Sequence, residues 1–331
     1  MDLFELTVTQ AASQIANRKL SPVLLMESLL GRIEQLEPSL KAWVTLDPEA
    51  SMAAARDSEA TLVKSGPKGP LHGVPIGVKD IFYTEGIRTT ACSEVYENFV
   101  PTYDAACLSR LKVSGAIMLG KTVTTPYAAS DPSPTINPWN PKHTPGGSSS
   151  GSGVAVAARM CPAALGSQTV GSTLRPAAYN GIVGLKPTYG RISLRGVIPL
   201  AWSLDTVGIL ARSVEDTALL LQVMAGHDPE DPASSTELTS NYLSSLKSYK
   251  LPPRIGLVRD FFYPLAQDQV RTHTDTVAQQ LAKLGAVIEE VKLPRIFDDH
   301  DEAGRTTFHV EAATVHHANF KTDPDKYPPL I

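Results

Sequence analysis

Three residues near the middle of this chain could together carry out nucleophilic hydrolysis. Lys79 lies in the apolar run GVPIGVKDIF, Ser148 in the loop TPGGSSSGSG and Ser172 in the stretch GSQTVGSTLRP. A serine hydroxyl is a weak nucleophile at neutral pH, so it needs a proton acceptor and hydrogen-bond donors for the developing oxyanion. A neutral lysine and a glycine-rich backbone can supply both.

Lys79 could act as the base only if it loses its proton. Lysine ordinarily titrates near 10.4 and is then a cation with no free lone pair. Burial among the apolar residues at positions 74, 76, 78 and 81 would lower its pKa and favour the neutral amine. The alternative is a surface lysine paired with Asp80, but the two serines downstream favour the base.

The Gly/Ser loop could bring backbone N–H groups close to a substrate, because its glycines allow conformations that are forbidden to other residues. No lysine lies between Gly146 and Val156, which argues against a phosphate-binding P-loop. Pro145 and an alanine-rich segment flank the loop, so we expect a tight turn above a helix N-terminus. The small and polar residues before Ser172 could direct several N–H groups at one oxygen.

Other catalytic residue types are poorly placed. The three cysteines, Cys92, Cys107 and Cys161, match neither a metal half-site nor a disulfide framework, and we expect buried thiols. The eight histidines show no triad-like setting, and the adjacent pair His316 and His317 lacks an HExxH pattern. The sequence therefore predicts no metal site.

The overall composition is that of a soluble globular protein. The 331 residues are 42% hydrophobic, and 30 basic against 34 acidic side chains give a net charge of −4. No run of like charges suggests binding of nucleic acid or anionic lipid. The first residues do not show the pattern of a signal peptide, and no stretch of about 18 apolar residues occurs. We expect a cytoplasmic protein that acts on a small molecule, away from membranes.

The pattern of elements predicts an α/β protein. The first seventy residues read as helices, one of them with Ser21 as N-cap and Pro22 at its first position. A short apolar strand leads to Lys79, and a helix that stops at Gly115 precedes a second strand. Ser213 and Asp216 predict a capping box, and residues 254–294 predict a β-α-β unit.

Taken together, these segments resemble the amidase signature family of Ser/cis-Ser/Lys amidohydrolases. The motifs are GVPIGVKDIF, TPGGSSSGSGVAVAA, GSQTVGSTLRPA and SLDTVGILARSVEDTALLL, in the family's order. The resemblance implies an amidase signature fold, a mixed twisted β-sheet core covered by helices on both faces. It implies one domain over residues 1–331, with a helical part at 1–70, the signature core at 71–226 and a β-α-β part at 227–331. Relatives usually run further, so we expect a truncated C-terminus.

The resemblance also implies roles for individual residues. Ser172 is the nucleophile, Ser148 the bridging serine that follows Gly147 through a cis peptide, and Lys79 the base that starts the proton relay. The remaining positions are an oxyanion hole and a substrate-binding set, with no metal and no organic cofactor. The oxyanion hole comprises the backbone of Thr169, Val170, Gly171 and Ser172, and the substrate-binding residues are Arg175, Gln168 and Ser149.

The chain departs from the common family pattern at several places. Gln168 stands where many members have aspartate, Val170 where they have glycine, and Cys92, whose role is open, where they often have glycine. Leu174 places Arg175 three residues after the nucleophile instead of two, as in malonamidase-like members, where this arginine pairs with a substrate carboxylate. A structural ion pair that holds the loop is the equal alternative.

The function implied is an amidohydrolase that cleaves a C–N bond of a small amide or carbamate, such as a urethane or aryl amide, through an acyl-serine. The alternative is the A-type subunit of an amidotransferase, which releases ammonia from glutamine for a partner complex. A non-catalytic scaffold is disfavoured because all three reacting residues are present. A homodimer stays open.

Overall fold

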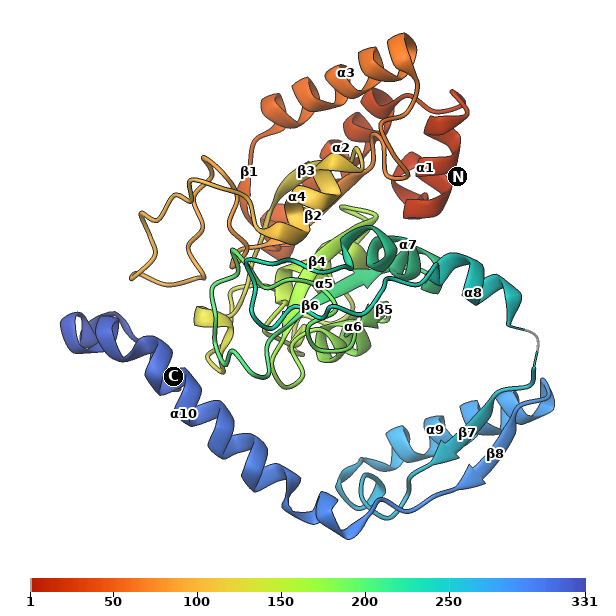
Figure 1. Cartoon of the computed structure of the whole chain (residues 1–331), viewed down its shortest axis with the longest axis vertical. Coiled ribbons are helices and arrows are strands. Elements are labelled where there is room, and N and C mark those ends of the chain that lie inside the picture. The colour runs from red at the N-terminus through yellow and green to blue at the C-terminus, as the bar shows by residue number, and fades with distance from the viewer. Residues whose placement is uncertain (1, 250) are drawn as a thin grey trace. The chain divides into compact units, whose positions relative to one another are not determined.

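The computed structural model describes residues 2–249 and 251–331 and has a mixed α/β fold, as expected from the sequence (Figure 1). Its contacts divide the chain into two compact units. Met1–Leu246 together with Phe308–Ile331 forms the first unit, and Lys247–Thr307 forms the second. The expected single domain with boundaries at 70 and 226 stays a prediction.

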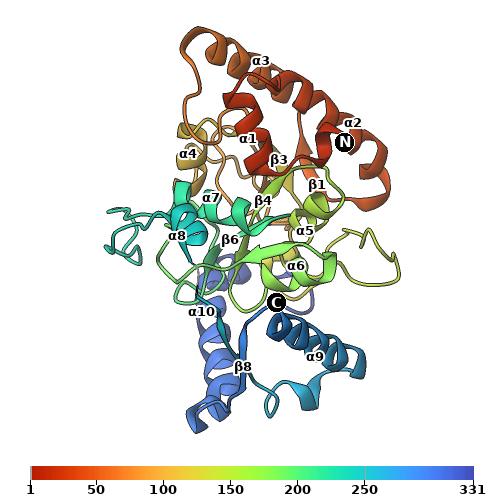
Figure 2. The same cartoon turned by 90° about the vertical axis from the view of Figure 1, so that its right-hand side faces the viewer.

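Three helices form the N-terminal part of the first unit: α1 (Val8–Ala16), α2 (Pro22–Leu40) and α3 (Pro48–Ser65). The expected cap of α2 is confirmed, because the Ser21 side chain accepts hydrogen bonds from the N–H groups of Val23 and Leu24. Both views place these helices together at one end of this unit (Figures 1 and 2).

A six-stranded mixed sheet forms the centre of the first unit, with strand order β1-β3-β2-β4-β6-β5. The strands are β1 (Trp43–Leu46), β2 (Pro75–Lys79), β3 (Ile117–Thr122), β4 (Ala163–Gln168), β5 (Val183–Leu185) and β6 (Thr206–Ala211). β2 pairs in parallel with both β3 and β4, whereas the other pairs are antiparallel. The carboxyl ends of β2 and β4 therefore meet at one edge of the sheet.

Helices cover both faces of this sheet. The helices after β2 in the first unit are α4 (Ala106–Val113), α5 (Ser150–Ala157), α6 (Leu174–Asn180) and α7 (Val214–Met224). One apolar cluster combines alternate strand residues such as Ile76, Leu165 and Ile209 with α1, α4 and α7. The other combines the opposite parity, such as Ala164 and Leu210, with α5 and α6. This alternation is what a two-faced sheet requires.

The second unit contains the β-α-β arrangement expected from the sequence. β7 (Arg254–Leu257) and β8 (Val287–Glu290) pair in parallel, and α9 (Asp268–Lys283) connects them. α8 (Tyr242–Ser248) and α10 (His300–Thr322) each include residues of both units. Short 3-10 turns complete the assignment: η1 (Leu3–Glu5), η2 (Pro126–Ala128), η3 (Tyr263–Leu265), η4 (Arg295–Asp299) and η5 (Pro324–Lys326).

The expected capping box of α7 forms only in part. Ser213 caps the helix by accepting from the Asp216 N–H at 3.1 Å. Asp216, however, does not reach back to Ser213, because its Oδ1 atom accepts from the N–H and hydroxyl of Thr9 at 2.8 and 2.9 Å. The carboxylate thus joins α7 to α1, a long-range contact that competes with the local box.

Gly151 lets α5 lie directly against the sheet. A Cβ atom at this position would lie 2.2 Å from the Ala42 carbonyl oxygen and 2.4 Å from the Val123 nitrogen, both rigid backbone atoms. Only glycine therefore fits here, and the close approach fixes the start of α5 behind the Gly/Ser loop.

We expect Gly151→Ala to lower the free energy of unfolding by about 3 kcal/mol or more, because the backbone atoms it meets cannot yield without moving β3. Gly31→Ala is the matched control. No atom lies within 4 Å of its added Cβ in α2, so a gain of about 0.5–1 kcal/mol is expected. Urea denaturation followed by circular dichroism measures both. Equal stabilities for the two variants would contradict this account of α5.

Candidate active site

Lys79 ends β2 with its side chain fully buried. Its Nζ atom lies 2.7 Å from the Ser148 hydroxyl and 2.8 Å from the Ser167 hydroxyl. Burial lowers the pKa of this amine from 10.5 to about 7, and the negative charge of Asp205 acts in the opposite direction. A sizeable share of the amine is therefore neutral near pH 7.

Ser148 is held in the turn before α5. Gly146 has a φ of 76°, and the peptide bond between Gly147 and Ser148 is cis, as the sequence resemblance implied. The Ser148 carbonyl oxygen accepts from the Thr125 N–H at 3.0 Å. The backbone thus orients the hydroxyl toward Lys79, with 1% of the residue exposed.

Ser172 lies in the turn between β4 and α6 and is 7% exposed. Its carbonyl oxygen accepts from the Ser149 N–H at 3.2 Å, so the two serine-bearing turns are neighbours. This arrangement follows from the parallel pairing of β2 with both β3 and β4, because the segments that carry Ser148 and Ser172 follow β3 and β4 at the same edge of the sheet.

The turn at residues 169–172 offers free donors. Within the described parts of the chain, the N–H groups of Val170, Gly171 and Ser172 donate to no other protein atom. Thr169 is fixed through its hydroxyl, which lies 2.5 Å from the Asp205 carboxylate. Free N–H groups in a fixed turn are what an oxyanion needs.

Gln168 and Ser149 use their polar atoms to shape these turns. The Gln168 Oε1 atom accepts from the N–H groups of Thr173 and Leu174 at 3.0 and 2.9 Å, and Nε2 donates to the Val170 carbonyl at 3.1 Å. Ser149 Oγ contacts the backbone nitrogen and oxygen of residue 167, both at 3.2 Å. A substrate contact for either side chain stays a prediction.

Arg175 lies beside the Ser148 turn. It is exposed, and its Nε atom donates to the Gly147 carbonyl oxygen at 3.0 Å. It forms no ion pair with any carboxylate in the described residues, so the structural ion pair considered from the sequence is not observed. Instead it lines a cavity of about 310 Å³ that also includes Ser130, Asp131 and Tyr179.

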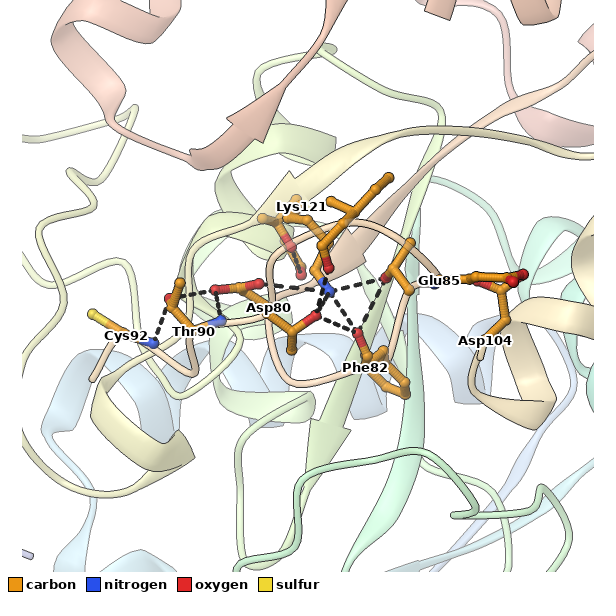
Figure 3. A network of polar contacts seen from close by, with 12 residues as sticks. Asp80, Phe82, Glu85, Thr90, Cys92, Asp104 and Lys121 are labelled. Atoms are coloured by element: carbon orange, nitrogen blue, oxygen red, sulfur yellow. Dashed lines mark hydrogen bonds and ion pairs between the residues drawn. The ribbon is translucent and has the colours of Figure 1, made fainter. Parts of the chain in front are cut away.

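Asp80 pairs with a second buried lysine, Lys121, which sequence reasoning missed (Figure 3). Lys121 near the end of β3 is unexposed, and its Nζ atom lies 3.5 Å from the Asp80 Oδ1 atom. Thr90 donates its N–H and hydroxyl to the other Asp80 oxygen, at 3.0 and 2.6 Å. Asp80, considered as a surface partner of Lys79, is therefore buried against Lys121, and Lys79 keeps no ion pair in the described structure.

Two further residues at the site were also missed. Ser167 occupies the variable position between Gly166 and Gln168 in the GSQTVGS motif, and Asp205 lies in SLDTVG, a stretch recognised only as a whole. Their position inside recognised motifs was the one feature of the sequence that could have identified Ser167 and Asp205 as site residues. Their contacts with Lys79 and Thr169 depend on folding across 88 and 36 residues.

The cysteines match the expectation of buried thiols only in part. Cys107 and Cys161 are buried, and burial raises the pKa of each thiol to about 12, whereas Cys92 is only half-buried. The buried His72 contacts Ser58. In residues 2–249 and 251–331, no three His, Cys, Asp or Glu side chains are grouped so as to hold a metal ion. None of the described helices combines the length and apolar character that a membrane span requires.

The amidase family model matches residues 25–326, which include every residue of the site described above. This chain belongs to the amidase family. The match confirms the resemblance inferred from the sequence motifs.

The relatives of this amidase-family chain include components of amidotransferases. The A-type subunit of glutamyl-tRNA(Gln) amidotransferase from Carboxydothermus hydrogenoformans is 42% identical over 300 residues, which cover 89% of this chain and 62% of that protein. Its counterpart from Chloroflexus aurantiacus is 40% identical over 324 residues, with 96% and 66% covered. The chain thus spans less than two thirds of the length of these relatives.

Solved structures agree on the fold. A chain from a vestigial protein complex that reveals the evolutionary origins of an s-triazine catabolic enzyme has a TM-score of 0.91 and 31% identity, covering 98% of this chain and 72% of that one. Peptide amidase from Stenotrophomonas maltophilia has a TM-score of 0.85 and 34% identity, with 96% and 68% covered. These solved structures therefore share the architecture of this chain.

The buried amine of Lys79 should reduce stability in a pH-dependent way. The unfolded chain keeps the ordinary pKa of 10.5, so between about pH 7 and that value it binds more protons than the folded protein. The free energy of unfolding contributed by this group therefore rises with pH across that window. Lys79→Met should raise the melting temperature most near pH 6.5 and least near pH 10, as thermal melts of both proteins would measure.

Lys121→Met is the control for this prediction. It leaves the buried Asp80 carboxylate without its cation, so a loss of about 3–5 kcal/mol is expected at neutral pH. If both methionine variants were destabilised to the same extent, Lys79 would not carry the desolvation penalty described here.

Proposed function

We propose that this amidase-family chain releases ammonia from the side-chain amide of glutamine through an acyl-serine at Ser172, as the A-type subunit of an amidotransferase. The 2.7 Å contact between Lys79 Nζ and Ser148 Oγ supports the chemistry, because it provides a buried base for a serine relay. The names of the relatives support glutamine and a partner complex. Such a protein would work in the cytoplasm with other subunits, without direct recognition of nucleic acid.

The reaction begins with neutral Lys79. It accepts the Ser148 hydroxyl proton while Ser148 Oγ takes the proton of Ser172, whose Oγ attacks the amide carbon. The N–H groups of the 169–172 turn stabilise the oxyanion. As the tetrahedral intermediate collapses, the C–N bond breaks, the relay returns one proton to nitrogen, and ammonia leaves. Water then attacks the acyl-serine by the same relay and releases the free acid.

The cavity beside Ser148 supports an amino-acid substrate. Arg175 and Asp131 line the same space of about 310 Å³, so it offers one guanidinium and one carboxylate. A guanidinium forms strong bidentate bonds with a carboxylate. Glutamine carries a carboxylate and an ammonium at the end opposite its side-chain amide, which suits these two charges.

A second candidate is a free amidohydrolase that acts on a small amide with a carboxylate. One observation favours it: Arg175 stands three residues after Ser172, as in malonamidase-like enzymes. This observation does not favour carbamates, so the urethane substrate expected from the sequence, like a homodimer, has no further support.

The shared chemistry is tested with an activity-based fluorophosphonate probe on the full chain. The probe should label Ser172, and Ser172→Ala should abolish both labelling and amide hydrolysis. Lys79→Ala should slow both by about 10²–10⁴-fold, because the relay loses its base. Ser65→Ala, an exposed serine on α3, is the control and should label normally. Near-normal hydrolysis by Lys79→Ala at pH 7 would overturn the mechanism.

The substrate is tested by comparing glutamine with the neutral amide butyramide. Arg175→Met should raise KM for glutamine at least about tenfold by removing a charge-assisted bond, with little effect on butyramide. Asp131→Asn should weaken glutamine binding but spare a monoamide dicarboxylate such as malonamate. Faster hydrolysis of malonamate than of glutamine, both with and without candidate partner subunits, would select the free hydrolase instead.

A further inference from the structure

Asp205 lies just before β6, and both oxygens of its carboxylate accept hydrogen bonds from neighbouring groups. It is 7% exposed. One carboxylate oxygen lies 2.5 Å from the Thr169 hydroxyl, and the other accepts from the N–H groups of Leu200 and Ala201 at 2.8 and 3.0 Å. Nothing in the sequence motifs assigned a role to this residue.

We propose that Asp205 is a positioning residue that holds the oxyanion turn in place and keeps a negative charge near the catalytic lysine. The proposal rests on the proposed acyl-serine chemistry, and not on the identity of the substrate. It gives Asp205 two separable effects, one through the hydroxyl of Thr169 and one through its charge.

The first effect follows from how weakly the turn is packed. Val170 at its tip is 73% exposed, so burial of side chains cannot fix the N–H groups. Hydrogen bonds hold the turn instead: Gln168 bonds to the backbone, the Ser149 N–H donates to the Ser172 carbonyl oxygen, and Thr169 bonds to Asp205. The bond to Asp205 is the one that fixes the Thr169 side of the turn. Its loss would let the oxyanion donors move, and small misplacements of catalytic groups cost rate steeply.

The turn that precedes Asp205 is held in place by a residue of α10. Glu311 on α10 is 8% exposed and accepts from the N–H and the hydroxyl of Ser203 at 3.0 and 2.6 Å. Ser203 belongs to the same Leu200–Asp205 turn that donates two N–H groups to Asp205. Hydrogen bonds to Glu311 thus stabilise the turn that holds the Asp205 carboxylate, and the carboxylate in turn fixes the position of the Thr169 hydroxyl.

The second effect is electrostatic. The charge of Asp205 acts on Lys79 at the end of β2, and Asp205 lines a cavity of about 250 Å³ together with Tyr189 and Asp231. Asp205 and Asp231, together with Glu311, raise the pKa of Tyr189 beyond the effect of burial, so this phenol stays neutral. The charge of Asp205 opposes the lowering of the Lys79 pKa by burial. Removing it should shift the pH at which Lys79 becomes neutral to a lower value.

Asp205→Asn and Thr169→Val separate the two effects. The measurement is the rate of fluorophosphonate labelling of Ser172 from about pH 5 to pH 9, which does not depend on the substrate. Asp205→Asn should lower the maximal rate about tenfold or more and move the midpoint of the rise to lower pH. Thr169→Val should lower the maximal rate without moving the midpoint, and Thr169→Ser, which keeps the hydroxyl, should restore it.

Asp231→Asn is the matched control, because it removes another buried charge from the same cavity without a contact to Thr169. It should change neither the maximal rate nor the midpoint. The proposal is overturned if Asp205→Asn behaves like Asp231→Asn, or if Thr169→Val moves the midpoint as far as Asp205→Asn does. Failure of the wild-type chain to label at Ser172 would instead contradict the proposed function, and thermal melts confirm that each variant is folded.

Discussion

The site depends on the burial of an amine that forms no ion pair with a carboxylate among the described residues. Desolvation is the larger influence on Lys79, and it lowers the pKa of that side chain into the range where a proton can be accepted. The adjacent carboxylate of Asp80 would prevent this if it lay beside the amine, but it is directed to Lys121 instead (Figure 3). The remaining charge, Asp205, acts on Lys79 without an ion pair in the described structure.

The topology of the sheet turns this isolated amine into part of a site. Because β2 lies between β3 and β4 and is parallel to both, three strands end at the same edge. The turn after β4 carries Ser172, and α5, packed through Gly151 against the backbone of Ala42 and Val123, places the Ser148 turn beside it. A site assembled from several strand ends is common in α/β proteins, since their loops gather there.

The sequence predicted the parts of this arrangement that are encoded locally. Ser21 and Ser213 act as helix caps because their bonds span only two or three residues, and Lys79, Ser148 and Ser172 were found because each sits in a recognisable motif. The missed contacts join distant positions. Asp216 reaches Thr9 across 207 residues, and neither residue alone carries a signal for the other. Only the fold reveals such pairs.

The two buried lysines show how hydrogen-bond partners, rather than burial alone, decide what such a residue can do. Lys121 donates to the Phe82 carbonyl oxygen and to the hydroxyls of Thr84 and Thr89, and it also faces the Asp80 carboxylate. Burial lowers the pKa of Lys121 to about 8, and the Asp80 charge opposes that change, so this amine keeps its proton more readily than Lys79. Lys79 contacts two serine hydroxyls, and a hydroxyl can donate as well as accept. The same contacts therefore persist when Lys79 is neutral, which allows a proton to pass between the amine and Ser148 without rearranging the buried site.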